Sequence, residues 1–127
     1  MSKTALIIDT SSHQAFVAIS ENGVIKKSTT IQDGKQLSKF LLPEIDALIE
    51  NYSLDYIALG IGPGSFTGTR IGATVAKTFG FALEIPVFTF FSTLLPDLEA
   101  IASLAYEKSQ KELPAAQIEL VYFSPTP

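Results

Sequence analysis

Small residues recur at every fourth position of the segment 66–84, and this repeat limits what the chain can fold into more than any other feature. The four residues are Gly68, Gly72, Ala76 and Gly80. Positions three and four apart share one face of a helix, and each glycine in a helix interior costs about 1 kcal/mol relative to alanine. The repeat therefore predicts a helix with one face that another segment approaches unusually closely.

The close neighbour of this face can belong to the same chain or to another protein, and the sequence leaves both readings open. Within the chain, the face would fit onto the sheet or onto another helix. The charged residues favour a second protein, because Arg70, Lys77 and Glu84 are seven residues apart and share one narrow line facing water. We therefore expect a partner helix on the small-residue face, so that Ala76→Glu should abolish partner binding and leave the chain folded.

The residues ahead of this helix predict a sharp turn. Gly62, Pro63 and Gly64 turn the chain at a point where larger residues would clash. Ser65 has the side chain and the position of a helix N-cap. We expect these four residues to form a structural loop together with Asp9, whose carboxylate follows the first predicted strand and accepts hydrogen bonds from turn amides.

Runs of apolar residues predict an α/β domain with the element order βββαβαβα. Residues 5–8 and 56–61 are apolar throughout, as in central strands buried on both faces, and the Asn22-Gly23 pair is typical of a tight hairpin. The order predicts a five-stranded mixed sheet covered by helices. The remaining strands are predicted at residues 15–20, 24–30 and 87–91, and the remaining helices at residues 36–52 and from about residue 95.

The first predicted helix has more apolar surface than one sheet can cover. Leu37, Leu41 and Ile45 recur at helical spacing, and further apolar residues widen their face to about 200°, against about 100° for one sheet-facing stripe. The excess predicts contact with a second partner, and Pro43 is expected to kink this helix or to mark its first turn. The further residues are Phe40, Leu42, Leu48, Ile49 and Tyr52.

The length of the chain allows one hydrophobic core. A chain of 127 residues, 46% of them hydrophobic, can bury one core and hardly two, so we expect one domain over residues 1–106. Residues 107–127 are expected to form a C-terminal extension, because a polar run and Pro114 end the last helix. Residues 118–123 have a β-favouring composition, and the extension either docks on the domain or stays disordered until a partner binds.

The composition excludes several classes of function. The net charge is -4 and the largest basic cluster is Lys26-Lys27, so the chain offers no footprint for the phosphates of tRNA. It has no cysteine and one histidine, which leaves no thiolate site and no histidine-rich metal centre. Neither a membrane span nor a signal peptide is recognisable, so we expect a cytoplasmic protein that binds no membrane.

A nucleotide-binding or nucleotide-hydrolysing enzyme is the alternative reading of the glycine-rich turn, because such a loop at a helix start is a natural anion site. The P-loop pattern is absent, since no two glycines stand five apart ahead of Lys and Ser or Thr. Asp9 lacks the converging carboxylates with which a nuclease holds Mg²⁺, and His13 is expected to be a solvated loop residue. We expect no catalytic, cofactor-binding or metal-binding residue in this chain.

Several blocks of the sequence resemble the TsaB (YeaZ) family of tRNA threonylcarbamoyladenosine biosynthesis proteins. They are Asp9-Thr10-Ser11, Leu41-Leu42-Pro43-x-Ile45, the long block from Gly60 to Gly72, Ala76-Lys77 and Ile85-Pro86. The resemblance runs over residues 5–92. It implies a ribonuclease H-like, actin-like ATPase lobe and a catalytically inactive paralogue of the catalytic subunit TsaD.

The resemblance also implies the partners. Family members form a heterodimer with TsaD through the two helices described above, and an ATPase, TsaE, joins the pair. The complex modifies the adenine next to the anticodon, and this chain would contact tRNA only through the complex. ATP and metal would bind to the partner subunits. A homodimer of this chain is a further option. The implied partner-binding residues are Leu37, Leu41, Ile45, Gly68, Thr69, Gly72, Ala73, Ala76 and Gly80.

The sequence departs from the family pattern at two positions and in its length. Thr69 stands where a larger aliphatic residue is usual, and Leu37 where many members have a polar residue. Members are also nearly twice as long and have a second lobe. Because the ending of this chain resembles the extreme C-terminus of longer members, we predict that the central part of the second lobe is deleted and that the terminal segment docks on the first lobe.

Overall fold

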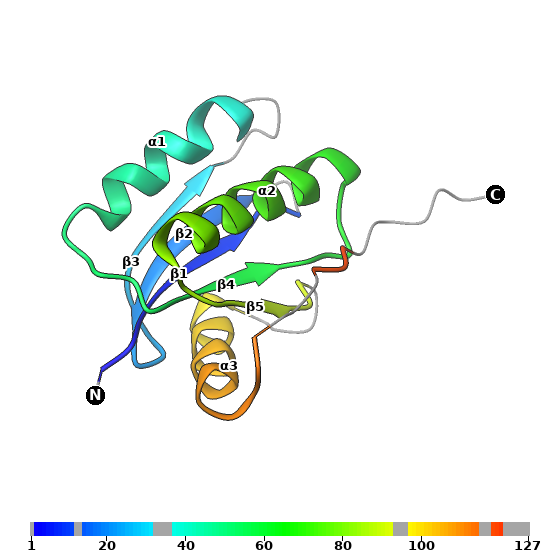
Figure 1. The fold of residues 1–127 in the computed structure, drawn as a ribbon. Helices are drawn as coiled ribbons and strands as arrows, with labels where there is room; N and C mark the ends of the chain where they lie inside the picture. The colour runs from blue at the N-terminus through cyan, green and yellow to red at the C-terminus, as the bar shows by residue number, and fades with distance from the viewer. Residues whose placement is uncertain (1, 12–13, 32–36, 93–96, 115–117, 121–127) are drawn as a thin grey trace.

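A five-stranded sheet lies at the centre of the molecule (Figure 1). The structure is a computed structural model and describes residues 2–11, 14–31, 37–92, 97–114 and 118–120. The predicted element order βββαβαβα is confirmed. The elements are β1 (Thr4–Asp9), β2 (Ala15–Glu21), β3 (Val24–Ile31), α1 (Leu37–Ile49), β4 (Tyr56–Gly60), α2 (Phe66–Leu83), β5 (Val87–Phe90) and α3 (Leu98–Lys111).

The sheet is mixed, with the strand order β3-β2-β1-β4-β5. β2 runs antiparallel to β1 and β3, whereas β4 runs parallel to β1 and β5. Because β1 and β4 are parallel, their carboxyl ends meet at one end of the sheet. This places Asp9 beside Gly60, so that the loop after β1 and the loop after β4, which together form the predicted structural loop, lie next to each other.

Helices cover both faces of the sheet. α1 and α2 lie side by side on one face, and α3 lies on the other (Figure 1). Alternate residues of β1 serve the two layers: Leu6 and Ile8 pack in the core under α1 and α2, while Ala5 and Ile7 pack in the core under α3. A strand that is buried on both faces has to be apolar throughout, as β1 is.

The β2–β3 connection is the tight hairpin that the Asn-Gly pair predicts. Asn22 and Gly23 have φ angles of 52° and 83°, the positive values that a two-residue hairpin turn requires. The backbone N–H of Asn22 donates to the carbonyl of Lys3 over 2.9 Å, which ties the hairpin to the start of β1.

α2 begins at the predicted cap. The Ser65 side chain accepts a hydrogen bond of 3.1 Å from the backbone N–H of Gly68. At the other end Glu84 adopts a left-handed conformation, with φ of 55°, and its backbone N–H donates to the Phe81 carbonyl. The helix therefore spans nearly the whole predicted segment 66–84.

Of the two options for Pro43, a kink or the first turn, the first turn is wrong, because Pro43 lies inside α1. It is on the exposed side of the helix, where water can bond the carbonyl that proline leaves free. α3 continues to Lys111 and so includes part of the polar run, while the division of the chain at residue 106 stays a prediction. The polar run extends the helix because Lys108 and Lys111 lie in its last turn, where cations are favourable.

The described part of the C-terminal extension packs on the domain. Ile118 and Leu120 are half-buried against the core under α1 and α2. These two residues thus dock on the domain. Residues 115–117 and 121–127 lie outside the described residues. Among the helices that are described, none combines the length and the apolar character needed to cross a membrane.

Removal of the α2 cap should lower stability by a measurable amount. We expect Ser65→Ala to reduce the free energy of unfolding by about 1 kcal/mol, because the Gly68 N–H loses its acceptor. Ser103→Ala, on the exposed side of α3, is the control and should change stability by less than about 0.5 kcal/mol. Urea unfolding followed by circular dichroism measures both, and equal values for the two variants would contradict the capping role.

Candidate partner-binding surface

The loop after β1 is held by its own hydrogen bonds. Asp9 is 6% exposed, and its Oδ1 accepts bonds from the backbone N–H and the Oγ of Ser11, at 3.0 and 2.7 Å. The Ser11 carbonyl in turn accepts from the Ser65 N–H at 3.0 Å. The Asp9 carboxylate therefore has the structural arrangement that its position after β1 predicts.

Thr10 is the close neighbour that the glycines of α2 require. Its Oγ1 donates to the carbonyl of Gly68 over 2.6 Å. A Cβ added to Gly68 would overlap the Thr10 carbonyl oxygen, and one added to Gly72 would overlap Thr10 Oγ1. The first half of the small-residue face is thus filled by the chain itself.

The second half of this face also packs inside the chain. Ala76 is fully buried in the core under α1 and α2. A Cβ on Gly80 would lie 2.9 Å from Cγ2 of Val87 in β5. The small residues therefore let α2 lie close to β1, its loop and β5, which is the reading within one chain.

The nine predicted partner-binding residues share this burial, and the physical reason given for them is corrected. They lie on the inward faces of α1 and α2, and the helical repeat that most of them share is the spacing of a face packed on the sheet. A partner role for them stays a prediction, but they offer no exposed area of their own. All nine are buried: Leu37, Leu41, Ile45, Gly68, Thr69, Gly72, Ala73, Ala76 and Gly80.

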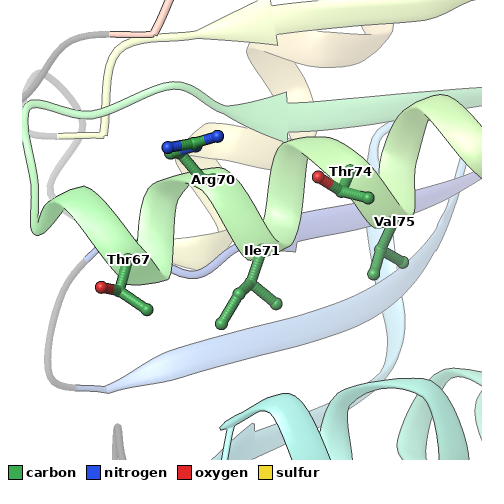
Figure 2. A pocket seen from close by; sticks show the side chains of 5 residues that line it. All are labelled: Thr67, Arg70, Ile71, Thr74 and Val75. Carbon is green, nitrogen blue, oxygen red and sulfur yellow. The ribbon is translucent and has the colours of Figure 1, made fainter.

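The outward side of α2 carries a shallow groove instead. It has a volume of about 350 Å³ and is lined by side chains of one helix. Figure 2 shows Thr67 and Ile71 pointing to the same side of α2, toward α1, with Arg70 on the opposite side. The lining residues are Thr67, Arg70, Ile71, Thr74 and Val75.

Large apolar side chains are also exposed on both helices. Phe81, which shares a helical line with Thr67 and Thr74, is 89% exposed. On α1, Phe40 and Leu42 are 40% and 48% exposed, on the two flanks of the buried stripe. They explain part of the over-wide apolar arc predicted for the first helix, and Phe81 marks the outer side of α2 as a candidate contact surface.

Other chemistry-bearing groups do not form a site in the described part of the chain. No group of three His, Asp or Glu residues lies close enough to hold a metal ion there. Asp55 accepts a bond from the Thr4 N–H at the far end of β1 from Asp9, so the two carboxylates do not converge. His13 and Asp33 lie outside the described residues.

Tyr56 is a buried tyrosine on the opposite face of the sheet from α1 and α2. Burial raises the pKa of Tyr56 above its ordinary value, while Ser109 and Ser20 oppose the rise. The ring lies in the core under α3, 5.7 Å from the Phe88 ring. A protonated phenol on that face of the sheet serves packing and has no part in the surface of α1 and α2.

Sequence reasoning missed Thr10 as the partner of the glycines. The signal was present, because Thr10 follows an apolar strand that must lie next to the strand preceding α2 in a parallel pair. The exposed line Thr67, Thr74 and Phe81 was missed as well, although it repeats every seven residues as the charged line does.

Comparisons with known proteins give the family. A family model described as "TsaD: tRNA N6-adenosine threonylcarbamoyltransferase" matches residues 24–117. TsaB of Haemophilus influenzae is 36% identical over 132 residues, which cover 95% of this chain and 52% of that protein. TsaB of Bacillus subtilis is 37% identical over 90 residues, covering 66% of this chain and 39% of that protein.

The solved structure of YeaZ from Pseudomonas aeruginosa agrees with the sequence matches. It superimposes with a TM-score of 0.64 at 33% identity, covering 70% of this chain and 44% of that chain. The molecule is thus a lobe of the ribonuclease H-like, actin-like class. The chain belongs to the family that the TsaD model describes, and within it to the TsaB (YeaZ) proteins, as the sequence motifs predicted.

The chain spans about half the length of the curated relatives that it matches. The alignment with the Haemophilus protein takes in 95% of this chain over only 132 residues. The predicted central deletion with a retained C-terminal segment stays a prediction, because these shares do not say which residues of the relative pair with residues 107–127.

A matched pair of substitutions tests which side of α2 is internal. We expect Ala76→Glu to cost about 3 kcal/mol or more and to unfold much of the protein, because it buries an unpaired charge. Thr74→Glu introduces the same side chain two residues away at an exposed site and should stay within about 0.5 kcal/mol of the parent. Urea unfolding gives both values, and an Ala76→Glu chain as stable as Thr74→Glu would contradict the inward packing of the small residues.

Proposed function

We propose that this chain is a non-catalytic partner subunit of the bacterial tRNA threonylcarbamoyladenosine transferase complex. It binds a TsaD-like catalytic subunit and supports the modification of the adenine next to the anticodon. Its curated relatives are called tRNA threonylcarbamoyladenosine biosynthesis proteins. Because the chain covers about half of those relatives, their role enters here as a proposal.

The observation that carries the proposal is the outer side of α2. A groove of about 350 Å³ lies on α2, and Phe81 at the same side of the helix is 89% exposed. An aromatic side chain so fully exposed on a regular helix gains free energy when a partner covers it. The surface next to the small residues, rather than the small residues themselves, is the proposed contact.

A role without catalysis is supported by the filled loop region. In an actin-like ATPase the backbone after the first strand approaches phosphate, whereas here Thr10 and Ser11 are each 2% exposed and bonded within the chain. A Cβ on Gly64 would overlap Ser11, so the glycine turn is occupied by protein. These contacts favour the partner subunit over a nucleotide-hydrolysing enzyme of the actin-like group.

The same proposal assigns the remaining parts of the reaction to other subunits. A net charge of -4 disfavours direct contact with tRNA phosphates, so tRNA is reached through the complex. This chain binds no cofactor of its own, and ATP and metal belong to the TsaD-like subunit and a TsaE-like ATPase. A homodimer through the same surface would compete with the catalytic subunit.

Binding to the catalytic subunit tests the proposal. We expect Thr74→Glu to weaken binding of the TsaD-like subunit from the same organism at least tenfold, because it places a charge in a closed contact. Ser103→Glu, on the exposed side of α3, should bind as the parent does. Isothermal titration calorimetry on folded variants measures this, and parent-like binding by Thr74→Glu would place the contact elsewhere.

The cellular consequence has a separate readout. Cells that lack this chain should lose threonylcarbamoyladenosine from their tRNA although the catalytic subunit is present, and Thr74→Glu should restore less of it than Ser103→Glu. Mass spectrometry of tRNA nucleosides measures the modification. Unchanged modification in the deletion strain would reject the assigned process, whatever the binding experiment gives.

A further inference from the structure

The segment 118–120 packs on the face of the sheet opposite to the helix that precedes it. α3 lies over the core that contains Ala5, Ile7 and Tyr56, whereas Ile118 and Leu120 pack against the core under α1 and α2. Residues 118–120 therefore lie in the other layer from α3, and residues 112–114, which follow the helix, are exposed.

The segment reaches the second layer at the carboxyl end of the sheet. Both figures place it beside the end of β5, where the chain continues after Phe90 (Figure 1, Figure 2). Backbone hydrogen bonds join the neighbouring connections there. The Ile61 N–H donates to the Phe90 carbonyl at 3.0 Å, and the Ser92 N–H donates to the Gly62 carbonyl at 2.9 Å.

The side chains of the segment alternate as in an extended strand with one buried face. Ile118 and Leu120 are half-buried, and Glu119 between them is exposed. In an extended chain, residues two apart share one face. The pattern places both aliphatic side chains on the core and the carboxylate in water.

We propose that residues 118–120 act as a strap, a short extended segment that closes the carboxyl end of the sheet and holds the connection from β4 to α2. Ile118 and Leu120 exclude water from the end of the core near Ile61. The strap thereby protects the hydrogen bonds between the β4 and β5 connections, and it fixes the point from which α2 starts. This role is independent of any partner.

Hydrogen exchange on the full chain tests the strap. In the double variant Ile118→Asp/Leu120→Asp, the amides of Ile61 and Ser92 should exchange at least tenfold faster than in the parent, and the Tm should fall by roughly 5 °C. The amide of Asn22, bonded to Lys3 at the opposite end of the sheet, should keep its rate. Leu113→Asp introduces the same charge at a side chain that is 91% exposed and should change nothing.

The exchange rates in the double variant either support or overturn the strap. Parent-like exchange at Ile61 and Ser92 in the double variant would overturn the proposal, as would an equal acceleration at Asn22, because that would show general destabilisation. If the double variant does not fold, the milder Ile118→Ala provides the same comparison. It should speed exchange at Ile61 by more than Glu119→Ala does, and equal rates in these two variants would also overturn the strap.

Discussion

The packing of Thr10 against α2 is the contact on which the rest of the structure depends. The Thr10 hydroxyl donates to the Gly68 carbonyl at 2.6 Å, and only a glycine at position 72 leaves room for it. This contact joins the end of β1 to the first turns of α2. It therefore fixes how deeply the helix lies on the sheet, and with it the position of every side chain on the outer face of the helix.

The same contact separates the two sides of α2 by role. The inner side is made of small residues because the sheet and the β1 loop lie so close. The outer side carries the groove and the exposed ring of Phe81. Internal packing thus uses the inner side of α2, and the proposed partner binding would use the opposite side of the same helix.

The fold was predictable because each strand and helix has a clear local signal. The apolar runs of β1 and β4, the Asn22-Gly23 turn and the Ser65 cap appear where the sequence predicts them. The orientation of α2 was not predictable from its own pattern. A stripe of small residues reports a close neighbour but not its identity, and the neighbour here, Thr10, is 58 residues away from Gly68 in the chain.

Thiol labelling tests the central claim, that α2 turns its small residues inward and offers its outer side to a partner. The chain has no cysteine, so Thr74→Cys and Ala76→Cys each create a single probe. We predict that Thr74→Cys reacts rapidly in the free chain and at least tenfold more slowly with saturating TsaD-like subunit, since the contact excludes the reagent, and that Ala76→Cys reacts slowly in both states. Rapid labelling of Ala76→Cys in the free folded chain, or an unchanged rate for Thr74→Cys in the complex, would contradict the account.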